Sequence, residues 1–200
     1  TNGQVGSVAG SSGTVTVTGA GSSWASSSLL HVGQAGSGTL TIADGGRVTN
    51  TIAYLGSSPG GSGTVKVTGA GSTWANAGLL RVGLRGTGTL TIENDGTVSN
   101  TDTFVGYLAG STGTVTVTGA GSTWTNSGEL HVGSAGTGTL TIADGGKVSN
   151  TVAVVGLESS STGTATVTGA GSTWTNSAEL YVGHQGTGTL TIENGGTVSN

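Results

Sequence analysis

Apolar and polar residues alternate in short runs along the whole chain. In residues 114–118 (Thr-Val-Thr-Val-Thr) a valine takes every second position, as a half-buried strand requires. Leu140 and Ile142 follow the same pattern one run later. Glycine-rich stretches, which favour tight turns, separate the runs. The pattern predicts an all-β protein of short strands, with Val115 and Val117 pointing inward and the threonines between them pointing outward.

The strand pattern has a fixed period of 50 residues. The four tryptophans of the chain recur at this interval, at Trp24, Trp74, Trp124 and Trp174. The 200 residues therefore divide into four tandem repeats without insertions, at 1–50, 51–100, 101–150 and 151–200. A fixed period of this kind indicates a stacked architecture in which each unit buries its apolar face against its neighbours. We expect one continuous β-solenoid over residues 1–200.

Each repeat contains two related halves. Residues 113–118 match 138–143, residues 124–126 match 148–150, and residues 130–133 match 153–156, in the same order. Three strand-like segments therefore recur in every half. This arrangement predicts about eight coils of about 25 residues each, two per repeat.

The spacing between equivalent residues supports a coil with three sides. Asparagines near the end of the second segment recur at alternating steps of 26 and 24 residues, and glycines after the third at alternating steps of 27 and 23. The first threonine of the Thr-x-Thr segment recurs at a constant step of 25 residues. The register of three strands is thus kept while the corners vary in length. We predict a parallel β-helix, right-handed as parallel crossovers generally are, about 38 Å long at about 4.8 Å per coil.

Large and small residues alternate in the predicted core. The second segment carries tryptophan in one half of the repeat and valine (Val48, Val98, Val148) in the other. We expect both to point inward and to pack as interdigitating layers. In the third segment Leu130 and Val132 are predicted to point inward.

An asparagine column accompanies these segments, at Asn50, Asn76, Asn100, Asn126, Asn150, Asn176 and Asn200, with Ser26 as its only departure. Its side chains either form a hydrogen-bonded ladder along the axis or only tolerate a turn geometry.

Composition and charge exclude several classes of partner. Only 7% of residues are charged and the net charge is -4, so a surface for nucleic acid or anionic membranes is not expected. No apolar run approaches the roughly 20 residues that span a bilayer. The chain has no cysteine, so no disulfide stabilises it. Its first residues already follow the repeat, so we do not expect a signal peptide among them.

Residues that could carry catalysis are scattered. His31 and His131 lie about four coils apart, too far to share a metal, and Asp44, Asp144, Glu93, Asp95 and Glu193 fall in sister turns. No catalytic, phosphate-binding or metal-binding motif occurs, so we expect a non-enzymatic protein with no cofactor and no metal. A polysaccharide-processing β-helix enzyme, which would use clustered carboxylates, is a minor alternative.

The outward positions of the first segment form a threonine array, interrupted only by Lys66. Such a flat grid of hydroxyls and methyls suits an ice-binding β-solenoid; it also fits the ordinary preference of exposed strands for threonine. The array comprises Thr14, Thr16, Thr39, Thr41, Thr64, Thr89, Thr91, Thr114, Thr116, Thr139, Thr141, Thr164, Thr166, Thr189 and Thr191.

The outward position of the third segment is the most varied column of the repeat. Aromatic and cationic side chains dominate it, and such groups often contact glycans or proteins. The alternative is an unconstrained solvent face. The candidate binding residues are His31, Tyr54, Arg81, Phe104, His131 and Tyr181, and Gln4 and Val154 complete the column.

Two stretches carry a resemblance to a known family. Residues 119–133 (GAGSTWTNSGELHVG) and 136–150 (GTGTLTIADGGKVSN) resemble the repeats of autotransporter passenger regions and related giant bacterial surface proteins. The resemblance covers all four repeats. It implies a right-handed parallel β-helix, export to the bacterial cell surface or the extracellular space, and a role as stalk, fibre or adhesin in adhesion, aggregation or biofilm. It transfers no active site.

The two ends of the chain are in phase. Asn200 followed by Thr1 reproduces the junction between Asn150 and Thr151, and neither end has a distinct capping sequence. Uncapped β-helix ends offer unpaired strand edges to another sheet. We therefore expect further repeats of a longer array, or end-to-end association between copies, as the main partner of this chain. Surface glycans or proteins of a host or bacterium are the other expected partners.

Overall fold

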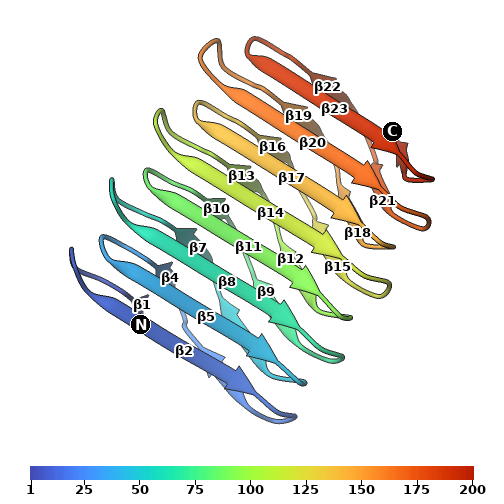
Figure 1. Ribbon diagram of the computed structural model, residues 1–200. Coiled ribbons are helices and arrows are strands. Elements are labelled where there is room, and N and C mark those ends of the chain that lie inside the picture. The colour runs from blue at the N-terminus through green and yellow to red at the C-terminus, as the bar shows by residue number, and fades with distance from the viewer.

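The computed structural model describes all 200 residues and contains 24 strands and no helix. Each coil contributes one strand to each of three parallel sheets of eight strands, which we name sheets A, B and C. The coils follow one another along a rod, and the two termini lie at opposite ends (Figure 1). The predicted β-solenoid of eight coils is therefore confirmed.

The strands of sheet A are three or four residues long. They are β1 (Gly3–Val5), β4 (Leu29–Val32), β7 (Ile52–Leu55), β10 (Leu80–Val82), β13 (Thr103–Val105), β16 (Leu130–Val132), β19 (Ala153–Val155) and β22 (Leu180–Val182). Those of sheet B are seven residues long: β2 (Ser12–Thr18), β5 (Ser37–Ala43), β8 (Ser62–Thr68), β11 (Thr87–Glu93), β14 (Thr112–Thr118), β17 (Thr137–Ala143), β20 (Thr162–Thr168) and β23 (Thr187–Glu193).

Sheet C again consists of short strands. They are β3 (Ser23–Ala25), β6 (Arg47–Asn50), β9 (Thr73–Asn76), β12 (Thr97–Asn100), β15 (Thr123–Asn126), β18 (Lys147–Asn150), β21 (Thr173–Asn176) and β24 (Thr197–Ser199). No helix of the chain has the length and apolar character needed to cross a membrane.

Equivalent residues of successive coils lie directly beside one another. In sheet B, Thr114 pairs with Thr89 on one side and Thr139 on the other, so the constant step of 25 residues is the register of the sheet. In sheet C, Val148 pairs with Trp124 and with Trp174. Both pairings confirm the predicted parallel, in-register stacking.

The core lies between the three sheets and follows the predicted alternation. Trp74, Trp124 and Trp174 are completely buried, and valines of the neighbouring coils separate them. Trp24, in the first coil, is only partly buried. Burying aromatic side chains of this size supplies a large hydrophobic contribution to folding.

Glycines at the corners are required for two different reasons. Gly106 has a φ of 71°, and a Cβ there would lie 2.2 Å from the carbonyl oxygen of Thr137. Gly146 does not have the positive φ that its corner position suggests. It is needed because a Cβ would lie 2.4 Å from the carbonyl oxygen of Val117 on the coil before it. Close approach between coils thus adds a constraint to turn geometry.

The asparagine column bonds to its neighbours, but not as a continuous ladder. The Nδ2 of Asn100 donates to Oδ1 of Asn126, and Asn150 donates in the same way to Asn176. At the next step Asn126 donates to the carbonyl oxygen of Ser149 instead. The amide–amide bonds therefore occur at alternate steps only.

The partner that interrupts the ladder is tryptophan. The indole Nε1 of Trp124 donates to Oδ1 of Asn100 at 2.9 Å, and Trp174 donates likewise to Asn150 at 2.7 Å. A buried indole N–H needs such an acceptor. Asparagine is therefore a structural requirement of each buried tryptophan, and none of these asparagines has a positive φ.

Candidate binding surface

The varied column predicted on the third segment is continuous in the structure. Its members pair one above another along sheet A in the order Gln4, His31, Tyr54, Arg81, Phe104, His131, Val154 and Tyr181. We call these residues the sheet A column. Because most strands of sheet A have three residues with the outer two pointing inward, the column is a single side chain wide.

Arg81 is the centre of an aromatic cluster. Its guanidinium carbon lies 4.2 Å from the ring centroid of Tyr107, 5.2 Å from that of Tyr54 and 6.0 Å from that of Phe104. Its Nη1 also donates a hydrogen bond to the hydroxyl of Tyr54 at 3.3 Å. Cation–π contacts of this kind each stabilise by about 0.5–2 kcal/mol. They hold the guanidinium at one place on the face of the rod.

Arg81 has no acidic partner. Lys66 forms an ion pair with Glu93 at 2.8 Å, and Nε2 of His131 lies at hydrogen-bonding distance, 2.8 Å, from Glu129. The Nε of Arg81 is buried and has no hydrogen-bond acceptor. Arg81 is thus a cationic side chain of this surface without a carboxylate partner, and a charge-assisted hydrogen bond from an anionic ligand would supply one.

The cluster extends to the next coil through Phe104. The ring of Phe104 meets Tyr107 edge-on at 4.9 Å and stacks on His131 at 4.8 Å. Nε2 of His131 contacts Glu129, while its Nδ1 is buried without a partner. His131 occupies its predicted outward position but is only 7% exposed, and the ring of Phe104 is stacked on it. Of the six candidate residues Tyr181 is the most exposed, at 44%, and His31, Tyr54, Arg81 and Phe104 are half-buried.

His31 lies at the other end of the cluster. Its ring meets that of Tyr54 edge-on at 5.5 Å, and its Nδ1 is 2.8 Å from the hydroxyl oxygen of Ser57. Burial lowers the pKa of His31 below its ordinary value, because desolvation disfavours the charged imidazolium. The structure thus joins His31, Tyr54, Arg81, Phe104 and His131 into one chain of contacts.

Tyr107 belongs to this surface although it lies outside the predicted column. It occupies the corner three residues after Phe104, and His184 takes the same place after Tyr181, with ring centroids 5.6 Å apart. The signal was available in the sequence, because the corner position directly follows the glycine that ends each third segment. It holds Ser7, Gln34, Ser57, Leu84, Tyr107, Ser134, Leu157 and His184.

The threonine array lies on sheet B and is wider than predicted. Both predicted columns pair in register from β2 to β23. A third hydroxyl column precedes them on every strand, so Lys66 is the one outward residue in the three columns without a hydroxyl. Lys66 pairs with Glu93 at the edge of this face. The third column contains Ser12, Ser37, Ser62, Thr87, Thr112, Thr137, Thr162 and Thr187.

The carboxylates of the sister turns form local bonds. Asp44 accepts a hydrogen bond from the hydroxyl of Thr18, and Asp144 accepts one from Thr118, both at 3.2 Å. Asp44, Asp95 and Asp144 have the positive φ of a turn. No group of three or more histidine, aspartate or glutamate side chains converges on one point that could hold a metal.

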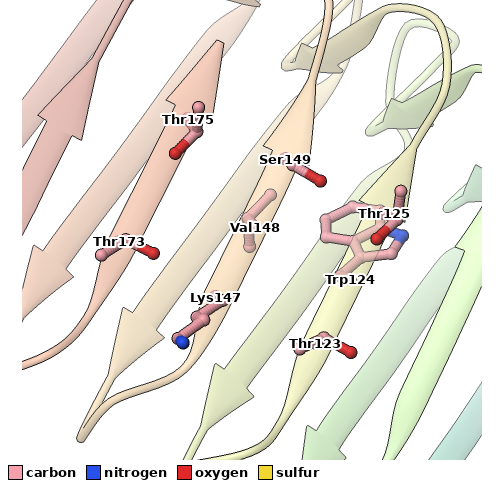
Figure 2. A pocket seen from close by; sticks show the side chains of 8 residues that line it. All are labelled: Thr123, Trp124, Thr125, Lys147, Val148, Ser149, Thr173 and Thr175. Carbon is pink, nitrogen blue, oxygen red and sulfur yellow. The ribbon is translucent and has the colours of Figure 1, made fainter.

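One shallow depression of about 240 Å³ lies on the outer face of sheet C. Lys147 stands there between Thr123 and Thr173, and Thr125, Ser149 and Thr175 form a parallel row (Figure 2). Trp124 and Val148 lie beneath these side chains and are buried in the core. The side chains that line the depression are mostly hydroxyls, with Lys147 as the one cationic group. The depression lies on a different sheet from the Arg81 cluster.

Comparison of this chain with protein-family models, with curated proteins and with solved structures gave no match in any of the three.

Proposed function

We propose that this chain is a non-enzymatic repeat rod of the bacterial cell surface or extracellular space, acting as a stalk, fibre or adhesin. The observation that carries the proposal is the unbroken register of eight coils over the whole chain. Every segment contributes to the rod or to a corner of it, and the side chains that vary most lie in the sheet A column. The resemblance of the repeats to autotransporter passenger regions supports the same role.

A surface-display experiment tests this proposal. The chain is placed between a membrane anchor and an epitope tag on non-adherent bacteria, and cells carrying anchor and tag alone are the control. We expect the rod to raise cell–cell aggregation or attachment to coated surfaces. Cells that stay as dispersed and non-adherent as the control would contradict an adhesive role. Release of new reducing ends from polysaccharides by the purified chain would contradict a non-enzymatic one.

Continuation of the rod into another copy is part of the proposal. Asn50 accepts from Trp74, which lies 24 residues later, and Asn100 and Trp124 have the same relation. Trp24 of a following copy would stand 24 residues after Asn200 in the continued rod and could donate to it in the same way. At the end of coil eight, Val182 and Ile192 are 44% and 50% exposed, although their equivalents in earlier coils are buried. A further coil, in the same chain or another, would cover them.

Sedimentation of the 200-residue chain over a range of concentrations tests this continuation. We expect association that increases with concentration and is reduced by Ile192→Lys, which places a charge on the end face. Thr116→Lys adds the same charge to the side of the rod, at a position where Lys66 is already tolerated, and should leave association unchanged. A monomer at every concentration would contradict end-to-end association.

Ice binding is the second candidate, and the third hydroxyl column on sheet B is the observation that favours it. Seven-residue parallel strands make this the widest flat face of the rod, and Lys66 alone interrupts its hydroxyls. Thermal hysteresis measures this activity. The candidate predicts a freezing-point gap that increases in Lys66→Thr and falls in Thr116→Lys. No gap in the parent chain and in Lys66→Thr would reject it.

A further inference from the structure

We propose that the cluster around Arg81 binds an acidic polysaccharide, with a uronate carboxylate on the guanidinium and sugar rings on the neighbouring aromatic faces. This inference rests on the proposed role as a surface rod and names the ligand class of its sheet A column. The residues that carry it are Arg81, Tyr54, Phe104 and Tyr107.

Charge selects an anionic ligand. Arg81 has no acidic partner, and Arg85 lies exposed in the corner of the same coil without an ion pair. Nε2 of His131, two coils from Arg81, already contacts Glu129. Arg81 and Arg85 bring two positive charges to the sheet A side of this coil, whereas its acidic residues, Glu93 and Asp95, follow at the end of the sheet B strand, and the chain as a whole has a net charge of -4. A carboxylate accepting from Arg81 would supply the missing acid.

The width of the surface selects a single polymer chain. The sheet A column offers one strand side chain and one corner side chain per coil, as at Phe104 and Tyr107. A stable protein–protein interface buries about 800 Å² on each partner, which needs a broad patch. A ligand that follows the rod axis instead meets Tyr54, Arg81 and Phe104 on consecutive coils.

Sugar rings suit this surface better than an extended peptide. Peptides commonly add a strand to a free sheet edge or insert side chains into pockets. Here the backbone of β10 is paired on both sides, by β7 and β13, and the one depression of the rod lies on sheet C. The partly exposed rings of Tyr54, Phe104 and Tyr107 instead provide apolar faces and a hydroxyl, which match the C–H faces and hydroxyls of a sugar.

Binding of polygalacturonate to the immobilised 200-residue chain tests the inference. Fully methyl-esterified polygalacturonate has the same backbone without the charge, and poly-L-glutamate has the charge without the sugar. We expect binding to polygalacturonate at about 0.15 M salt and at least tenfold weaker binding to the other two polymers.

The variants use residues that the rod already accepts at equivalent places. Arg81→Gln copies Gln4, Tyr107→Ser copies Ser134, and both should weaken binding about tenfold or more while the circular dichroism spectrum is unchanged. Arg47→Gln removes the same charge from the exposed face of sheet C and should leave binding intact.

Three outcomes would overturn the inference. They are no binding to polygalacturonate, equal binding to poly-L-glutamate, and equal loss in Arg47→Gln and Arg81→Gln. The proposed function fails separately, because displayed rods that neither aggregate nor attach would contradict it whatever the purified chain binds. Attachment of cells to surfaces without uronate, with no binding to polygalacturonate, would reject the ligand class alone.

Discussion

The indole nitrogen of Trp124 donates a hydrogen bond to Oδ1 of Asn100, 2.9 Å away on the preceding coil, inside the core. Asn100 also donates to Asn126 on the following coil. Trp124 and Asn126 lie in the same strand, β15, so one amide bridges two side chains of the following coil. The bond explains why a buried asparagine stands on the coil before each of Trp74, Trp124 and Trp174.

Replacing Asn100 by alanine should destabilise the rod by about 1–3 kcal/mol, because it leaves the N–H of Trp124 buried without an acceptor. A double-mutant cycle with Trp124→Phe isolates this bond in denaturant unfolding, and we expect a coupling of about 1 kcal/mol. Asn50→Ala is the control, because Asn50 accepts from Trp74, which lies two coils before Trp124. It should add to Trp124→Phe without coupling, and equal coupling in both cycles would argue against the bond.

Truncating the tryptophans should cost different amounts at different coils. Trp124→Ala removes a fully buried side chain and should lower the free energy of unfolding by about 3–5 kcal/mol. Trp24→Ala should cost less, because Trp24 is only partly buried and has no Asn acceptor in the chain. Urea midpoints compare the two variants. A larger loss at Trp24 would contradict the core described here.

Two corner glycines with similar backbone angles should respond differently to alanine. Gly106 and Gly110 have φ angles of 71° and 78°. A Cβ at Gly106 would meet the carbonyl of Thr137, whereas a Cβ at Gly110 would meet nothing within 4 Å. Gly110→Ala should cost only the left-handed backbone term of about 1–2 kcal/mol, and Gly106→Ala about 3 kcal/mol or more. Similar unfolding midpoints would contradict the close contact between coils.

Acid should destabilise the rod through His31. Because burial lowers its pKa in the folded state, the unfolded chain binds the proton more tightly. At high pH His31 is neutral in both states and does not affect the free energy of unfolding. As the pH drops through about 6.5, the unfolded chain takes up the proton first and the free energy of unfolding falls. It levels off once the pH is below the pKa of His31 in the folded state. His31→Gln, which copies Gln4, should remove this part of the pH dependence. If the unfolding midpoints of the parent chain and of His31→Gln shift equally with pH, this role of His31 is contradicted.

Much of the fold follows from spacing alone. The constant step from Thr89 to Thr114 is the sheet register, and the alternation of Trp124 with Val148 is the layering of the core. Both depend on one strand period, which the sequence displays directly. The Trp–Asn bond was not predicted, although its signal was present. Asn50 precedes Trp74 by the same 24 residues that separate Asn100 from Trp124.

The candidate site was predicted only in part, for a geometric reason. The sheet A column follows from strand register, so His31, Tyr54, Arg81 and Phe104 could be aligned beforehand. Tyr107 lies at a corner, where chain length varies between coils and strand periodicity says nothing about side-chain direction. Packing between rings was equally hidden, and it buries His131 beneath Phe104.

The most direct test of the rod is a set of distances between spin labels along one ridge. The chain has no cysteine, so pairs of cysteines introduced at outward threonines of sheet B can be labelled selectively. With Thr39 as the fixed site, labels at Thr114, Thr164 and Thr189 lie about 14, 24 and 29 Å away at about 4.8 Å per coil. We predict that electron–electron dipolar measurements give distances that increase linearly with the number of coils. Distances that do not increase in this order, as in an antiparallel meander, would contradict the stacked rod on which the proposed function depends.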